Sequence, residues 1–312
     1  MAEDNFSFDT PANNDNNTVY TGDSITVENP ITEQPTKDGI YGLSDTEMSD
    51  PNAIKVCISD TQTPVIILFG PASCGKTMTL VRITRYLKSK GYNVNPKRDF
   101  RPSYDSNYAK MCNDFNEMIN SDNAAKSTSH VSFMLVEVSK TGGKPVCQIL
   151  EAPGELYFSL NNPNAGFPTY VNEIIASNIR KIWTISVEPD WLDPQDRANY
   201  VTRIRSLKTQ LSPRDKVLFI YNKVDKTNYV FSPGNVNMEQ LIRYTEQQYP
   251  NIFIPFLNQN PITKLWKKYN CELVPFQTGT YNDRQDGEKT YVPSHENYSR
   301  NLWNMLLKLI KG

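Results

Sequence analysis

The sequence predicts an α/β fold, a three-layer arrangement in which helices cover both faces of a mostly parallel sheet. From about Asn52 onward, short β-branched runs alternate with segments of helical periodicity. The clearest run, residues 64–69, is apolar at every position after its proline, which is typical of a strand buried on both faces. With 312 residues, 38% apolar and 21% charged, the chain can bury such a core without disulfides or structural metals.

The net charge of −1 conceals an asymmetry along the chain. Residues 1–50 hold eleven acidic residues and one lysine, a net charge of −10, so the remaining residues carry +9. The acidic stretch is poor in aliphatic residues and cannot bury enough surface to offset its ordering entropy. We therefore expect a disordered acidic tail over residues 1–50 and a folded domain over residues 51–312.

Cysteine usage and hydropathy indicate the compartment. The five cysteines are an odd number without a Cys-x-x-Cys pair, which favours reduced thiols over a disulfide framework or a zinc site. The first residues lack the basic start and apolar core of a signal peptide, and no apolar run is long enough to cross a bilayer. These features predict a cytoplasmic protein without a membrane span.

Each expected element has a local reason. Leu80, Ile83 and Leu87 fall on one face of a helix over residues 77–90, which Gly91 ends. β-Branched and aromatic runs predict further strands over residues 131–138, 145–150, 181–187, 216–221 and 272–276, the first two joined as a hairpin by the glycines at 142 and 143. Apolar residues at three- and four-residue spacing predict helices over residues 104–120, 194–211, 238–248 and 261–269, and from His295 onward.

The first strand runs into a phosphate-binding motif. Residues 70–77, Gly-Pro-Ala-Ser-Cys-Gly-Lys-Thr, match the pattern Gly-x₄-Gly-Lys-Ser/Thr. Its glycines let backbone N–H groups converge on phosphate oxygens at the positive end of the following helix, Lys76 adds a charge for the β and γ phosphates, and the Thr77 hydroxyl suits Mg²⁺. The candidate nucleotide contacts here are Gly70, Ser73, Cys74, Gly75, Lys76, Thr77 and Met78.

A second motif indicates the base. Asn222-Lys223-Val224-Asp225 follows the strand over residues 216–221. The Asp225 carboxylate can accept two hydrogen bonds from guanine, whereas adenine offers no donor pair on that edge. Lys223 would cover the base with its alkyl stem, and Asn222 would tie this loop to the phosphate loop. Guanine selectivity of at least about 10²-fold follows from two charge-assisted hydrogen bonds.

With these motifs in this order, residues 60–312 resemble the P-loop GTPases of the Ras-like and translation-factor-like superclass. The resemblance implies a Ras-like P-loop NTPase fold, GTP or GDP with Mg²⁺ as ligands, and two switch segments. Where the family has Asp-x-x-Gly, this chain has Glu151-Ala-Pro-Gly154 followed by Glu155. By resemblance, Glu151 would reach Mg²⁺, Gly154 would donate its N–H to the γ-phosphate, and Glu155 stands where many members orient water with a glutamine. The Pro-Gly-Glu ending is similar to that of poorly characterised GTPase-like domains of bacterial conflict systems.

The remaining family positions are less clear in the sequence. A first-switch threonine that binds Mg²⁺ would be Thr128, although a plain loop residue fits as well. The slot of the last guanine-contacting loop holds Thr278 and Gly279. Relative to a minimal GTPase, insertions are expected at about residues 93–130 and 229–270.

Two basic clusters have open interpretations. Lys97, Arg98 and Arg101 could supply a built-in arginine finger, and a solvated basic face is the simpler interpretation. For Trp266, with lysines on both sides, we expect a helix that docks the indole in the core rather than a partner or nucleic-acid face.

Three functional hypotheses follow. The leading one is a regulatory GTPase of low intrinsic rate that switches the binding of an unidentified protein effector or activator through residues 93–130 and 151–170; the catalytic candidates are Lys76, Gly154 and Glu155. The alternative is a pseudo-GTPase, a scaffold that holds nucleotide without turning it over. A metabolite kinase would leave Asn222 to Asp225 unexplained, and nucleic acid is not an expected partner.

Overall fold

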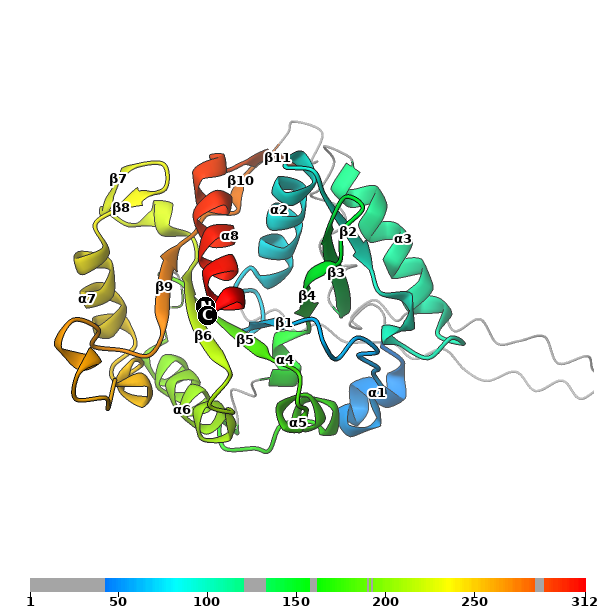
Figure 1. The fold of residues 1–312 in the computed structure, drawn as a ribbon, viewed down its shortest axis with the longest axis horizontal. Coiled ribbons are helices and arrows are strands. Elements are labelled where there is room, and N and C mark those ends of the chain that lie inside the picture. The colour runs from blue at the N-terminus through cyan, green and yellow to red at the C-terminus, as the bar shows by residue number, and fades with distance from the viewer. Residues whose placement is uncertain (1–42, 121–132, 158–161, 190, 192, 284–288) are drawn as a thin grey trace, which may run out of the picture. The chain divides into compact units, whose positions relative to one another are not determined.

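The computed structural model describes residues 43–120, 133–157, 162–189, 191, 193–283 and 289–312. Its centre is a seven-stranded sheet in the order β2-β3-β4-β1-β5-β6-β9 (Figure 1). The strands are β1 (Val65–Phe69), β2 (Tyr92–Pro96), β3 (Met134–Lys140), β4 (Pro145–Glu151), β5 (Lys181–Val187), β6 (Lys216–Tyr221) and β9 (Glu272–Pro275). The strand β3 runs antiparallel to β2 and β4, and the other neighbouring strands are parallel. The predicted mostly parallel sheet and its hairpin are confirmed.

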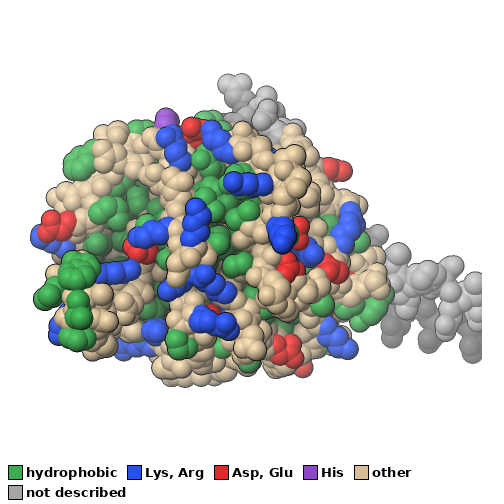
Figure 2. All heavy atoms as spheres, viewed as in Figure 1, with side chains coloured by type: hydrophobic (Ala, Val, Ile, Leu, Met, Phe, Trp, Pro, Cys, Tyr) green, Lys and Arg blue, Asp and Glu red, His purple; other side chains and the backbone are tan. Residues whose placement is uncertain are grey.

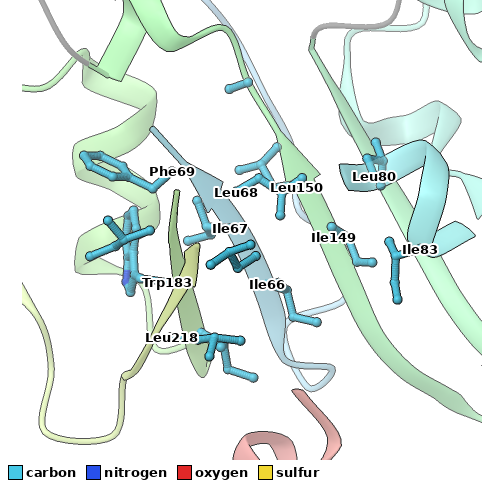
Figure 3. Packing of buried hydrophobic residues seen from close by; sticks show 14 of the residues in the cluster. Ile66, Ile67, Leu68, Phe69, Leu80, Ile83, Ile149, Leu150, Trp183 and Leu218 are labelled. Atoms are coloured by element: carbon cyan, nitrogen blue, oxygen red, sulfur yellow. The ribbon is translucent and has the colours of Figure 1, made fainter. Parts of the chain in front are cut away.

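Every residue of β1 is buried, because β4 and β5 flank it and helices cover both of its faces. On one side Phe69 stacks on Tyr200 with ring centroids 6.3 Å apart. Figure 3 shows Phe69 and Trp183 on that side, while Leu80 and Ile83 lie on the other. This two-sided burial is the reason that β1 reads as a continuous apolar run.

Helices complete the three layers. They are α1 (Asp45–Ser49), α2 (Lys76–Ser89), α3 (Ser106–Asn120), α4 (Gly154–Tyr157), α5 (Thr169–Ala176), α6 (Pro194–Gln210), α7 (Met238–Gln248) and α8 (Glu296–Lys311). On one face α2 packs against both α3 and α8, and α5 and α6 lie on the other (Figure 1). The fold is therefore the predicted three-layer α/β arrangement of P-loop NTPases. In the described part of the chain, no helix has both the length and the apolar composition that crossing a bilayer requires.

Several elements escape the sequence patterns. They include β2, α5, and two small hairpins, β7 (Val230–Ser232) with β8 (Asn235–Val236) and β10 (Gly279–Asp283) with β11 (Lys289–Pro293). The strand β2 alternates polar and apolar residues too briefly to be distinguished from a loop, and it exists because it pairs with β3.

The end of the acidic stretch differs from expectation. Its last residues form α1, which begins with a capping box between Ser44 and Glu47. Arg101 fixes this helix, because its guanidinium lies 2.6 Å from the Glu47 carboxylate and also donates to Asp105 and to the Lys55 carbonyl. Residues 43–50 are thus part of the fold, whereas residues 1–42 lie outside the described residues. Arg101, 5% exposed, is neither an arginine finger nor a solvated residue.

The expected helix over residues 261–269 is wrong. Only a single 3₁₀ turn, Thr263–Leu265, forms there. The Asn258 backbone N–H and side-chain amide donate to the carbonyls of Lys268 and Lys267, so the chain folds back where a helix would continue. Trp266 is consequently 73% exposed instead of docked in the core.

Candidate functional site

The phosphate loop lies between the end of β1 and the start of α2, in the position that the motif requires. Gly75 adopts a left-handed conformation with φ of +84°, and a Cβ at this position would overlap the side-chain amide of Asn222. Lys76 is buried, and its ammonium donates to the Pro71 carbonyl at 2.8 Å across the loop. The loop therefore wraps around the Lys76 side chain. The left-handed turn that allows this needs glycine at position 75.

The second motif meets this loop directly. The Asn222 side-chain amide donates to the Cys74 carbonyl at 3.0 Å, and its oxygen accepts from the Lys223 N–H. Val224 N–H donates to the Phe276 carbonyl, which anchors the same loop to the end of β9. Asp225 is exposed at the tip. The structure thus brings together the two motifs that lie about 150 residues apart, as the sequence predicts.

Glu151 contacts the last residue of the phosphate-binding motif. It is 1% exposed at the end of β4, and its Oε1 accepts from the Thr77 hydroxyl at 2.9 Å. The extra methylene, compared with aspartate, carries the carboxyl group directly to Thr77. Burial raises the pKa of Glu151 to about 8; Lys76 and the Thr77 hydroxyl oppose this shift, and Glu155 adds to it.

A magnesium ion fits this pair of side chains. Glu151 Oε2 is buried and lacks a hydrogen-bond partner among the described residues. Mg²⁺ prefers one or two protein oxygens completed by water and phosphate oxygens. Thr77 and Glu151 provide such a set, and a cation would satisfy the orphaned oxygen and draw the proton off the carboxyl group. Thr128, the expected third ligand, lies outside the described residues.

Gly154 begins α4 directly beneath the phosphate loop. A Cβ at this position would overlap the backbone of Pro71 and Ala72, so only glycine lets the two segments approach so closely. Glu155, the next residue, is exposed. The segment after β4 therefore packs on the phosphate loop itself.

Sequence reasoning missed Glu188. This residue, 9% exposed, follows β5 and lies 2.6 Å from the Lys223 ammonium. Tyr249 holds Glu188 in place, because its hydroxyl donates to the Glu188 carbonyl at 2.8 Å. The available signal was positional: the residue that follows a parallel strand lies at the carboxyl edge of the sheet, where ligands bind.

The other candidate contacts are positioned by the backbone. Burial raises the pKa of the Cys74 thiol, so this residue offers its backbone rather than a thiolate. Met78 is half-buried in the first turn of α2. Thr278 and Gly279 follow β9, and the Thr278 carbonyl accepts from Tyr291 and from Ser294 N–H, which fixes the loop against β11.

Comparison with known proteins gives fold-level similarities. No protein-family model and no curated protein sequence matches the chain. Among solved structures, a candidate nucleolar GTP-binding protein 1 from Plasmodium falciparum has 13% identity and a TM-score of 0.40, with 82% of this chain and 90% of that chain covered. The GTPase-like domain of Saccharomyces cerevisiae Ski7, bound to GTP, has 12% identity, a TM-score of 0.42, and coverage of 81% and 51%.

A third similar structure is the translation elongation factor SelB from Methanococcus maripaludis with the GTP analogue GppNHp, at 10% identity and a TM-score of 0.34. It covers 82% of this chain, and this chain spans only 35% of its length. At these identities and scores the similarities carry no argument about function, and the P-loop NTPase fold of this chain rests on its own sheet order and on the motif between β1 and α2.

The Glu151 carboxyl group should make stability depend on pH. In Mg²⁺-free solution the folded chain keeps a proton that the unfolded chain, with an ordinary pKa of 4.5, has lost. The free energy of unfolding should therefore fall as pH rises from about 4.5 to about 8, by at most about 1.4 kcal/mol per pH unit. Urea denaturation with EDTA across this range measures it. Glu151→Gln should flatten this part of the curve; curves that stay parallel would contradict the assignment.

The packing of Gly154 predicts a specific sensitivity. Gly154→Ala forces the phosphate loop backbone to move, so we expect a stability loss of about 1–3 kcal/mol and weakened nucleotide binding. Gly166→Ala is the matched control, because a Cβ there meets nothing within 4 Å and should change neither property. Thermal denaturation and nucleotide titration of both variants distinguish the two sites, and equal behaviour would refute the close approach.

Proposed function

We propose that this chain binds GTP and GDP with Mg²⁺ and acts as a regulatory GTPase of low intrinsic rate. The observation that carries the proposal is the hydrogen bond from Asn222 to the Cys74 carbonyl, which joins residues 222–225, the proposed base-recognition loop, to the phosphate loop. Lys76 and Thr77 then face the phosphates and Asp225 the base.

Lys223 supports the guanine assignment. It has a left-handed backbone with φ of 52°, and its ammonium pairs with Glu188. This pairing holds the alkyl stem in one direction, two residues before the exposed Asp225. The stem would cover the face of either purine, whereas the carboxylate selects guanine, because adenine offers no donor pair on that edge.

The low rate follows from the residue after Gly154. In many GTPases a glutamine orients the attacking water. Here that position holds Glu155, whose negative charge is repelled by the γ-phosphate unless a cation compensates for it. An activator that supplies such a cation, or a water-orienting group, would raise the rate.

The switch is proposed to act through the segment after β4 and through residues 93–130. Gly154 lies against the phosphate loop, so a γ-phosphate must displace or engage it. The chain beyond it is held by Arg203, which is 3% exposed and donates to the carbonyls of Tyr157, Ala165 and Gly166. Movement of this segment would change the surface offered to a protein effector. Residues 121–130 and 158–161, within these two segments, lie outside the described residues.

A second candidate, a nucleotide-holding scaffold without turnover, is favoured by the two glutamates. Glu151 is hydrogen-bonded to Thr77 and Glu155 lacks the amide of a water-orienting residue. Turnover separates the two candidates. The parent protein should release phosphate slowly over multiple turnovers with GTP and Mg²⁺, and Lys76→Ala should abolish this release. The control Lys144→Ala, in the exposed β3–β4 turn, should match the parent protein. Tight GTP binding with no Lys76-dependent release would support the scaffold.

Base selectivity tests the guanine contact independently of hydrolysis. Asp225→Asn should weaken GTP binding by about 10²-fold or more and favour xanthosine triphosphate, whose additional carbonyl accepts from the new amide. Competition of both nucleotides against a fluorescent GTP analogue measures the ratio. A parent protein that binds ATP more tightly than GTP would exclude the proposal.

A further inference from the structure

Residues 254–268, which we name the apolar lobe, precede β9 and form an exposed apolar surface. Among the described residues, eight large apolar side chains are exposed, and five of them belong to this lobe: Ile254, Leu257, Ile262, Leu265 and Trp266. The last three are 65–78% exposed. Figure 2 shows the corresponding cluster of hydrophobic side chains at the edge where Figure 1 places the loop before β9. Contiguous apolar surface of this kind marks an interaction site.

Two asparagine side chains hold the backbone of the lobe in the turn that exposes these apolar residues. The Asn258 side-chain amide donates to the Lys267 carbonyl and to the Thr263 hydroxyl, at 2.9 and 2.8 Å. Asn260 Oδ1 accepts from the N–H groups of Ile262 and Thr263. Polar groups at the base of the turn are thus satisfied within the lobe, and its apolar tip is presented in a fixed conformation.

The charged residues of the lobe itself are all lysines. Residues 247–271 contain Lys264, Lys267 and Lys268 and no acidic residue. Lys267 and Lys268 pair with Glu272 and Glu246 at the edges of the segment, yet their side chains stay 44% and 70% exposed. An apolar tip with lysines beside it therefore faces the solvent.

We propose that the apolar lobe docks on an anionic phospholipid surface. Aliphatic side chains insert between acyl chains, tryptophan favours the membrane interface, and lysines extend to lipid phosphates. Single-stranded nucleic acid is recognised by stacking on aromatic rings, and four of the five exposed apolar residues are aliphatic. Protein interfaces are depleted of lysine, whereas this lobe has three.

The topology leaves the nucleotide site accessible in the docked state. The lobe leads into the start of β9 at Glu272, and the base-recognition loop meets the end of that strand through the Phe276 carbonyl. The apolar lobe and the base-recognition loop therefore lie at opposite ends of β9. This inference goes beyond the proposed function and does not depend on it.

The four tryptophans give a direct test on the full chain. Trp183 and Trp303 are buried and Trp191 is half-buried, so Trp266 alone is well exposed. The protein should sediment with vesicles of phosphatidylcholine that contain about one third phosphatidylserine. These vesicles should also shift the tryptophan fluorescence to the blue and protect it from quenching by iodide. Vesicles of phosphatidylcholine alone should do so far less.

Matched variants locate the contact. Trp266→Ala should abolish the blue shift and lower the partition coefficient by about fivefold or more, and Lys264→Glu should lower it by a similar factor. Phe231→Ala, 70% exposed elsewhere, and Lys144→Glu are the controls and should bind like the parent protein. Nucleotide affinity should be unchanged in all four.

Four results would overturn the proposal. The first is equal partitioning of Trp266→Ala and the parent protein into vesicles. The second and third are Trp266-dependent binding to an oligonucleotide, or Trp266-dependent self-association, in a protein that does not bind vesicles. The fourth is a Trp266 that is already shielded from iodide in the free protein and whose fluorescence does not change when vesicles are added. The last would show that the chain covers its own lobe.

Discussion

The hydrogen bond between the Asn222 amide and the Cys74 carbonyl is the contact on which the candidate site depends. It can form because β1 and β6 are separated by one strand, β5, which places their ends about 10 Å apart at the same edge of the sheet. A nucleotide must bridge that interval to offer its phosphates to one loop and its base to the other. Burial of both strands makes the interval rigid, so the two loops are preorganised rather than assembled by the ligand.

The segment after β4 is fixed at both ends. Glu151 is buried where a cation would compensate its charge, and without a cation it keeps a proton, at a pKa of about 8. Gly154 is pressed against the phosphate loop, while Arg203 secures the chain a few residues later. In the proposed switch, a short segment with one end at the phosphate loop and the other fixed to α6 would convert a small change at the γ-phosphate into a change of backbone path.

The central sheet and the two motif loops could be predicted from the sequence because their signals are local. The runs that form β5 and β6 are short and mostly apolar, which is typical of strands buried on both faces. The glycines of the phosphate motif define its turn. The strand β2 and the pairing of Lys223 with Glu188 could not be predicted, since each depends on a partner distant in sequence. The exposure of Trp266 could not be predicted for a different reason: lysines and apolar residues at helical spacing suggest a helix, but hydrogen bonds from Asn258 to the Lys267 and Lys268 carbonyls fold the segment back as a loop.

The two surfaces of the molecule are connected by a stiff element. Lys267 fastens the lobe to β9, because its ammonium donates to Glu272 at 3.1 Å, and Lys308 ties α8 to the same carboxylate. The strand β9 is in turn paired with β6 along its length. Phe276, directly after β9, donates its N–H to the Tyr221 carbonyl at the end of β6. A force on the lobe can reach the base-recognition loop through the sheet, which is costly to move in a close-packed core, or through the end of α7, where Glu246 pairs with Lys268 and Tyr249 donates to the Glu188 carbonyl. Because neither route ends at the segment after β4, docking through the lobe would localise the protein without engaging the proposed γ-phosphate switch.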